Sequence, residues 1–296
     1  MKWEGNRESD NVEDRRGDDS GGGGGFRLGG GSIGLGTVAV ALVASYFFGV
    51  DPGTIINLLS GGGAQVQQSQ RAEQAPAHKP PADDKTARFV ATVLADTEDV
   101  WTQVFANGKA TYQKPTLVLF PNRTATACGT GETATGPFYC PGDRKVYIDL
   151  SFFKLMEQRF HVNGEFAQAY VIAHEVGHHV QNLMGIMTRV DKLRQRATPA
   201  QANALSVRVE LQADCFAGVW AKRANQARQI LEAGDIETAL NAATAIGDDA
   251  LQQQARGYVV PDSFTHGTSA QRVRWFTRGI DSGQVSACDT FGAKTL

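Results

Sequence analysis

The chain has 296 residues, with 29 Lys and Arg against 31 Asp and Glu, which gives a net charge of −2 with neutral His. This charge balance disfavours nucleic-acid binding, because no basic stripe interleaved with aromatic residues is present to neutralise phosphates. Hydrophobic residues make up 42% of the chain, and the part after residue 86 is long enough for one domain with a substantial core.

The N-terminal part of the chain is polar and Gly-rich, with an uninterrupted Gly run at 21–25. Such a composition buries too little apolar surface to order itself, so residues 1–30 are predicted to be a disordered cytoplasmic segment. An uncharged apolar run then extends from Ile33 to Val50 and is just long enough to cross a bilayer. We therefore expect one transmembrane anchor over residues 31–52; a buried core helix is the alternative.

The Lys and Arg distribution predicts how this anchor is oriented. Five basic residues precede the apolar run: Lys2, Arg7, Arg15, Arg16 and Arg27. None lies between Asp51 and Gln70. Since basic flanks stay in the cytoplasm, we expect a single-pass protein of the inner membrane whose larger part faces the periplasm or the exterior.

The segments after the anchor change from linker-like to domain-like. Residues 60–86 are rich in Gln, Ala, Gly and Pro, which predicts a flexible linker before a globular domain over 87–296. The domain should open with an amphipathic helix over 87–105. Strands are predicted at 116–120 and 146–150, where β-branched and aromatic residues gather. The sequence does not indicate which strand lies at the edge of the sheet.

The four cysteines allow three pairings. Cys128 and Cys140 flank a loop with Gly, Thr and Pro, which suits a short disulfide, and a Cys215–Cys288 bond would tie the C-terminal tail to a helix. This pairing is the one we expect, and an even count is compatible with an oxidising compartment. Four reduced cysteines or a Cys metal site are the alternatives; without a C-x-x-C pair, a zinc ribbon is disfavoured.

Helical patterns dominate the remainder of the chain. Helices are predicted at about 151–158, 164–184, 200–223, 227–233, 235–254 and 269–280. Thr198 is a suitable N-cap for the third of these, followed by Pro199 at the first helical position. A small sheet with this many helices predicts an α+β fold that is mainly helical.

Residues 174–178 have the form H-E-x-x-H inside an apolar, helix-like run. On a helix, positions i and i+4 share a face, so His174 and His178 can bind one metal ion. Glu175 lies beside them, where it can act as a general base on water. His179 lies about 100° around the helix, so a core or surface role is expected for it. The alternative is a helix with His on one solvated or core-lining side.

A zinc site of this kind needs a third protein ligand and an open fourth position. Glu210 and Asp214 lie four residues apart in the predicted helix over 200–223 and therefore share a face. Glu210 can complete a His, His, Glu set, and Asp214 can accept the free N–H of a ligand imidazole. The alternative is a solvated pair of acids on an amphipathic helix.

At this point the chain resembles the bacterial family named "putative neutral zinc metallopeptidase". Four stretches carry the resemblance: GPFYCPGDRKVYIDLSFF, HEVGHHVQ, ELQADCFAGVWA and THGTSAQR. More broadly, H-E-x-x-H followed by E-x-x-x-D is similar to the gluzincin proteases, and the third His of metzincins is absent. The resemblance implies a zincin-like domain with Zn²⁺ held by His174, His178 and Glu210, Glu175 as base, and Asp214 behind a ligand His. It also implies that a sheet edge near the active helix binds extended peptide.

Two residues near the C-terminus are further candidates. His266 could donate to the oxyanion that develops during hydrolysis. Its segment is similar to a His-Pro-Ser segment with a later Arg in membrane-linked gluzincins, except that Gly267 replaces the Pro. Arg272 could pair with Asp214 or Glu210, or bind a substrate carbonyl. A loop His and a solvated Arg are the alternatives.

These patterns together predict a membrane-anchored zinc endopeptidase that acts on a peptide or protein substrate through activated water. A non-catalytic zinc protein of the envelope, with a structural or partner-binding role, is one alternative. A peptidoglycan amidase is another, since the same metal chemistry would serve it.

Overall fold

The structure is a computed structural model that describes residues 1–17, 78–133 and 136–296. Within these ranges, no helix combines the length and the apolar character that crossing a membrane requires. The predicted anchor over 31–52 and most of the predicted linker over 60–86 lie outside the described residues. The described part is α+β and mainly helical, as predicted.

A four-stranded sheet has the order β1-β2-β6-β5, with β1, β2 and β6 parallel and β5 antiparallel to β6. Its strands are β1 (Val12–Asp14), β2 (Thr116–Leu119), β6 (Lys145–Ile148) and β5 (Phe138–Cys140). A separate hairpin consists of β3 (Arg123–Thr126) and β4 (Gly129–Glu132). The two predicted strands are β2 and β6, which lie inside the sheet and are largely buried on both faces. The edge that neighbours the helices is β5.

The prediction that residues 1–30 are disordered is wrong for residues 1–17. Strand β1 pairs with β2, and the Trp3 ring packs edge-on against Phe89 with ring centroids 5.4 Å apart. The buried carboxylate of Glu98 accepts hydrogen bonds from three side chains of this segment: Arg7, Ser9 and Asn11. The mean composition of 1–30 is dominated by glycines beyond residue 17, and it hides the polar partners that order the first part.

The β1–β2 pairing also bears on the predicted membrane topology. Residues 1–17 and 78–296 belong to one compact unit, joined by parallel strand pairs such as Val12 with Leu117. One crossing between residues 17 and 78 would leave β1 and β2 on opposite sides of a bilayer. A single-pass chain with a cytoplasmic N-terminus and an external domain is therefore incompatible with this sheet.

The helices follow the predicted order, with three differences. They are α3 (Lys85–Asn107), α4 (Ser151–Phe160), α5 (Glu165–Leu183), α6 (Ile186–Arg194), α7 (Pro199–Arg228), α8 (Asp235–Ala245), α9 (Asp248–Arg256) and α10 (Ser269–Ser282). Helix α6 was not predicted. The predicted helix over 227–233 is absent, because α7 continues to Arg228 and Gln229, at φ 52°, ends it in the left-handed region.

The predicted helix over 235–254 is broken into α8 and α9 at Gly247. A Cβ atom on Gly247 would lie 2.5 Å from the backbone nitrogen of Ser269, so the chain segments meet here only because this residue has no side chain. The break also turns Asp248 and Asp249 toward the start of α10, where they accept backbone N–H groups.

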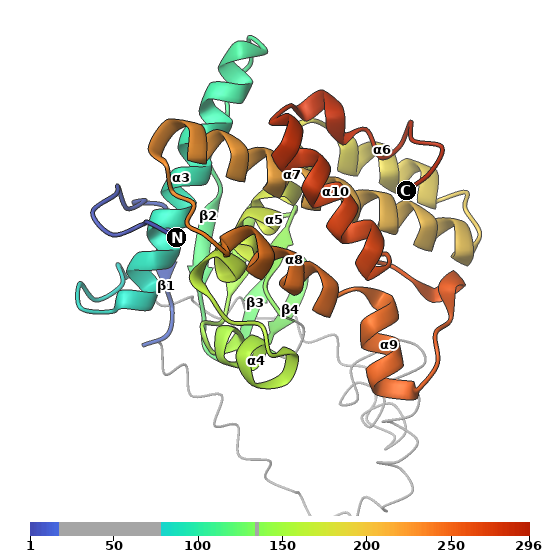
Figure 1. The fold of residues 1–296 in the computed structure, drawn as a ribbon, viewed down its shortest axis with the longest axis horizontal. Coiled ribbons are helices and arrows are strands. Elements are labelled where there is room, and N and C mark those ends of the chain that lie inside the picture. The colour runs from blue at the N-terminus through green and yellow to red at the C-terminus, as the bar shows by residue number, and fades with distance from the viewer. Residues whose placement is uncertain (18–77, 134–135) are drawn as a thin grey trace, which may run out of the picture. The chain divides into compact units, whose positions relative to one another are not determined.

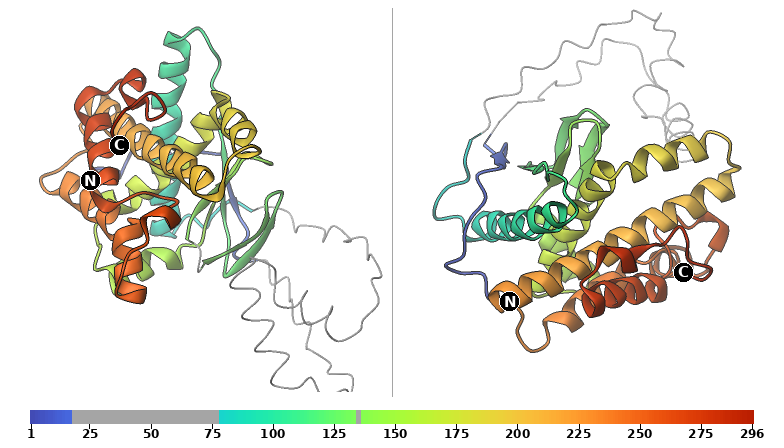
Figure 2. Two further views of the ribbon diagram at one scale, coloured as in Figure 1. Left: turned by 90° about the vertical axis from the view of Figure 1, so that its right-hand side faces the viewer. Right: turned by 90° about the horizontal axis from the view of Figure 1, so that it is seen from above.

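Helix α5 lies between the sheet and α7, and α10 packs along α7 (Figure 1; Figure 2, right). Two ring contacts mark the core that joins α3, α5 and α7. Trp101 meets Phe216 edge-on with centroids 5.5 Å apart, and Phe166 stacks on Trp220 at 6.0 Å. Burial of such large rings stabilises the arrangement by roughly 1.5–3 kcal/mol for each ring. The central helix that carries the H-E-x-x-H motif is therefore held from both sides.

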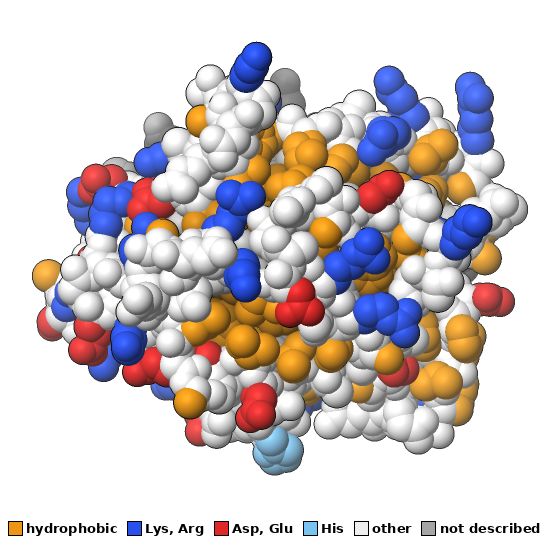
Figure 3. Space-filling model, turned by 45° about the horizontal axis from the view of Figure 1, so that its top comes forward, with side chains coloured by type: hydrophobic (Ala, Val, Ile, Leu, Met, Phe, Trp, Pro, Cys, Tyr) orange, Lys and Arg blue, Asp and Glu red, His pale blue; other side chains and the backbone are white. Residues whose placement is uncertain are grey.

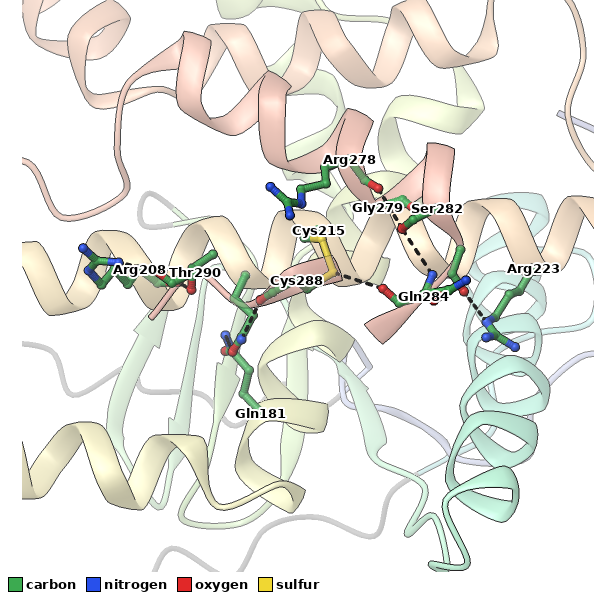
Figure 4. Close-up of a disulfide and its surroundings, with 12 residues drawn as sticks. Gln181, Arg208, Cys215, Arg223, Arg278, Gly279, Ser282, Gln284, Cys288 and Thr290 are labelled. Carbon is green, nitrogen blue, oxygen red and sulfur yellow. Dashed lines mark hydrogen bonds between the residues drawn. A yellow bond between two sulfur atoms is a disulfide. The ribbon is translucent and has the colours of Figure 1, made fainter. Parts of the chain in front are cut away.

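Both expected disulfides are present. Cys128, in the turn between β3 and β4, pairs with Cys140 in β5, and Cys215 on α7 pairs with Cys288 in the tail. Figure 4 shows the second bond at the contact between α7 and the C-terminal segment. By chain entropy, closing the 73-residue separation should stabilise the fold by about 4 kcal/mol.

Candidate metal centre

The buried helix α5 brings the H-E-x-x-H residues to one place. Its apolar side chains face the core on nearly every side; His174 and Glu175 are buried, and His178 is partly buried. One helical turn separates His174 and His178, and their ring centroids lie 4.8 Å apart. The two imidazoles therefore leave the same face of the helix, as the spacing predicts.

The second helix of the site, α7, approaches α5 closely at Gly177. A Cβ atom there would lie 3.1 Å from the carbonyl oxygen of Ala213, so a larger residue would push the helices apart. Thr198 caps α7 through a capping box with Gln201, which fixes the start of the helix. The close approach places the acids of α7 opposite the imidazoles of α5.

The Glu210 carboxylate faces both imidazoles. Its Oε2 lies 3.2 Å from Nε2 of His174, and its Oε1 lies 3.6 Å from Nε2 of His178. One ligand atom from each of the three residues lies within 4.8 Å of the others. Two nitrogens and one carboxylate oxygen that converge in this way suit a divalent ion such as Zn²⁺, with a fourth position left for water.

Asp214 fixes the orientation of the His174 ring. Its Oδ1 accepts a hydrogen bond from Nδ1 of His174 at 2.8 Å, so Nε2, which faces Glu210, is the ring nitrogen left for a metal ion. The Tyr170 hydroxyl also donates to Asp214 at 2.6 Å. Arg272 is buried and donates to both oxygens of Asp214 at 2.9 Å. Of the partners expected for Arg272, the structure thus places it on Asp214.

Charge and burial oppose each other in this cluster. Burial by itself would lower the pKa of His174, but Asp214 and Glu210 outweigh it and raise this pKa to about 10. Burial would raise the pKa of Asp214, but Arg272 and His174 hold it well below its usual range. The pKa of Glu210 is likewise lowered, against burial, by His178 and His174. Negative charge that holds a proton on these imidazoles would equally hold a divalent cation in its place.

His178 has a partner that the sequence reading missed. Its Nδ1 lies 2.9 Å from Oε1 of Gln181, one turn further along α5. Gln181 is fully buried. The sequence does contain a pattern that could have predicted this contact. His178 and Gln181 have an i, i+3 spacing within one helix, which places the two side chains on neighbouring positions of the same face.

Glu175 lines a cavity of about 600 Å³ together with both ligand imidazoles. Burial raises the pKa of its carboxyl, which suits a base that must take up a proton near neutrality. Within the described residues, no hydrogen bond or ion pair occupies this carboxylate. The cavity is also lined by Phe138 and Tyr139 of the edge strand β5 and by Leu155 of α4.

His266 lines the same cavity, and its side chain is about half exposed. Asp248 lies 3.3 Å from its Nδ1 and also accepts its backbone N–H at 2.6 Å. The hydrogen bond with Asp248 raises the pKa of His266, which favours the protonated, donating form. The structure therefore brings this residue to the site through the loop that precedes α10.

His179 takes the core role expected for it. It is fully buried, with Nε2 2.6 Å from the carbonyl oxygen of Gln113 and Nδ1 3.0 Å from the Tyr139 hydroxyl. Burial lowers its pKa to about 4, so the ring is neutral near pH 7. It connects α5 to strand β5 rather than joining the metal ligands.

Fold and site together define a mainly helical α+β protein in which an H-E-x-x-H helix lies beside a small sheet, and two imidazoles with a carboxylate from a second helix could hold a metal ion. The chain belongs to the family described as "Putative neutral zinc metallopeptidase", whose sequence profile matches residues 1–291. The match includes the ordered N-terminal segment as well as the metal centre.

Two relatives are similar over different lengths. The chain is 55% identical to the uncharacterized protein YpfJ of Escherichia coli K12 over 295 residues, 99% of each chain. It is 44% identical to the uncharacterized protein Rv2575 of Mycobacterium tuberculosis H37Rv over 195 residues, 62% of this chain and 65% of that protein. No solved structure matches the chain. Neither relative's name states an activity, so the chemistry must be argued from the site.

Proposed function

We propose that this protein is a zinc-dependent endopeptidase that hydrolyses peptide bonds with water. The convergence of two Nε2 atoms and one carboxylate on a single point carries this proposal. The hydrogen-bond partners of both rings support it, because they direct each free lone pair toward that point. The family to which the chain belongs supports zinc as the metal.

The roles of the residues follow from their surroundings. When bound, a zinc ion supplies Lewis acidity, which polarises the scissile carbonyl and acidifies the attacking water. Glu175 takes the proton from that water and passes it to the leaving amine, so one water is added as one C–N bond breaks. His266, kept protonated by Asp248, donates a hydrogen bond to the developing oxyanion.

The edge strand β5 provides a place for an extended substrate. Its pairing within the described sheet is to β6 alone, and two of its residues, Phe138 and Tyr139, line the cavity. An extended peptide can add to such an edge through its backbone and fill side pockets with alternate side chains. We therefore infer a polypeptide substrate, bound in an extended form beside α5.

We also propose that the described unit faces an oxidising compartment, the periplasm or the exterior, at the inner membrane. Two disulfides support this, because such bonds are rare in reducing compartments. In view of the β1–β2 pairing, the N-terminal segment must lie on the same side as the rest of the unit.

The decisive test is Glu175→Gln in the purified full-length chain. The substitution keeps the size of the side chain but removes the base, so hydrolysis of a peptide library should fall by roughly 100- to 10,000-fold. Bound zinc, measured by elemental analysis, should remain at the wild-type level because Glu175 is not a ligand. Cleavage is read by mass spectrometry, with and without chelator.

Full activity in this variant, or zinc lost along with activity, would contradict the roles assigned to Glu175. A wild-type chain that cleaves muropeptides but no member of the peptide library would be an amidase. A chain that binds zinc and cleaves neither would be the non-catalytic envelope protein.

A further inference from the structure

A chain of buried amides leads away from the metal centre toward the C-terminal tail. Gln181 donates from Nε2 to the carbonyl oxygen of Val209 at 2.7 Å and to Oε1 of Gln212 at 3.1 Å. Gln212 donates in turn from Nε2 to the carbonyl oxygen of Cys288 at 2.8 Å. Both Gln side chains are buried, so any partner that they lost would not be replaced by bulk water.

The direction of every hydrogen bond in this series of buried amides is determined by the backbone carbonyl groups that its members contact. Backbone carbonyls such as those of Val209 and Cys288 can only accept, so each must face an amide NH₂ group. The Gln181 Oε1 must then point at His178, where it can only accept from Nδ1 at 2.9 Å. His178 therefore carries its proton on Nδ1, which leaves the Nε2 lone pair free for a metal ion.

The end of this hydrogen-bond series at Cys288 is covalently fixed. Cys288 is bonded to Cys215, which lies on α7 directly after Asp214. Figure 4 shows Gln181 on the α5 side of this disulfide, with the tail between it and α10. The disulfide thus holds the carbonyl oxygen that orients Gln212, and Gln212 orients Gln181.

We propose that Gln181 and Gln212 form a relay that positions His178 for metal binding and that the Cys215–Cys288 disulfide anchors this relay. The inference rests on the proposed zinc site, of which His178 is a ligand. Gln181 and Gln212 are positioning residues, since they act through His178. The C-terminal tail, far from the site in sequence, thereby contributes to zinc affinity.

The first experiment compares zinc affinity in full-length wild type, Gln181→Met and Gln212→Met by chelator competition. Met has a similar length but does not accept the Nδ1–H, so Gln181→Met should weaken zinc binding by about 10- to 100-fold. The visible spectrum of the Co²⁺-substituted protein should change as well, because the His178 ring is no longer held. Ile280→Val, a core change on α10, serves as a control for general loss of stability.

The double variant Gln181→Met/Gln212→Met separates a relay from two independent effects. If Gln212 acts only through Gln181, the double variant should bind zinc no more weakly than Gln181→Met alone. Losses that add would overturn the relay. Cys215→Ser/Cys288→Ser should also weaken zinc binding, whereas Cys128→Ser/Cys140→Ser, the matched control, should not.

A readout without metal keeps the two proposals distinguishable. The Nδ1–H proton of His178, buried against Gln181, should give a slowly exchanging imidazole resonance in the NMR spectrum, and Gln181→Met should abolish it. If wild type binds no zinc but shows this resonance, the proposed function fails, whereas the orientation of the His178 ring by Gln181 still holds. If Gln181→Met retains the resonance, or binds zinc within threefold of wild type with an unchanged Co²⁺ spectrum, the relay is wrong.

Discussion

At the scale of single residues, the proposed site separates residues that would hold a metal ion from residues that would assist the reaction. The ligand imidazoles each have a buried acceptor behind them, Asp214 for His174 and Gln181 for His178. His266 differs in its exposure: Asp248 raises its pKa, as Asp214 raises that of His174, but half of the His266 side chain is exposed. A half-exposed imidazole can titrate without disturbing the core around it.

The His266–Asp248 pair predicts a specific dependence of stability on pH. Because the folded pKa of His266 is raised, the pair stabilises the protein fully below the unfolded value of about 6.5. Its contribution is lost as the pH rises through the folded pKa. His266→Gln should therefore lower the Tm most near pH 5–6 and least at alkaline pH. The corresponding loss in the free energy of unfolding should be under about 1 kcal/mol for such an exposed pair.

Thermal unfolding from about pH 5 to 9 measures this difference. In an Asp248→Asn background the pH dependence of the His266→Gln effect should disappear, since the partner charge is gone. An effect that does not vary with pH in the wild-type background would show that the pair is not ionic.

At the scale of elements, small residues decide how closely the helices approach. Helices α7 and α10 touch at Gly218 and Gly279, where Cβ atoms would meet backbone atoms of the opposite helix, Ile280 and Val219 among them. This contact determines the position of α10 along the axis of α7. Since Arg272 is carried by α10 and Asp214 by α7, the same contact sets their pairing.

Gly279→Ala should separate the two helices and so act on the metal centre from a distance. The added methyl group would contact the carbonyl oxygen of Cys215, and overpacking of this kind costs about 1–3 kcal/mol. Urea unfolding should show a lower midpoint, and zinc affinity should fall with it. Thr277→Ala, a partly exposed change on the same helix, should stay within about 0.5 kcal/mol of wild type. Wild-type stability in Gly279→Ala would mean that the helices tolerate a wider separation.

At the scale of the whole molecule, the open questions are the cellular compartment of the protein and the side of the membrane on which each part of the chain lies. On the face in Figure 3, apolar side chains gather in an area below the centre and in smaller groups elsewhere, with basic and acidic side chains around them. Over the whole sequence the charges nearly balance, with a net charge of −2, which does not favour nucleic-acid binding. The ordered N-terminal segment constrains the proposed membrane topology, because β1 belongs to the same sheet as β2.

A labelling experiment in cells tests this topology. All four cysteines are paired, so one introduced cysteine is the only reactive thiol in each variant. Asn6→Cys and Lys192→Cys, both exposed, should react with a membrane-impermeant maleimide from the same side of the inner membrane. Labelling of Lys192→Cys from outside, with Asn6→Cys protected until the membrane is lysed, would restore the single-pass arrangement and contradict the β1–β2 pairing.

The spacing of residues along helices made much of the site predictable. His174 and His178, like Glu210 and Asp214, are four apart, and helical geometry alone puts each pair on one face. Gln181 was missed because its role depends on Val209 and Gln212, which lie near it only in the folded chain. Mean composition misled for residues 1–17, whose order comes from partners on α3 and β2 that are distant in sequence.

The sequence by itself determined the ligand types, the helices that carry them and the cysteines available for pairing, because these are properties of local spacing and composition. Only the tertiary structure decided that α5 and α7 approach at Gly177, that Arg272 pairs with Asp214, and that β5 is the edge beside the cavity. Those outcomes depend on contacts between segments far apart in the chain. Packing, which acts over distances in space, selects among arrangements that local pattern leaves open.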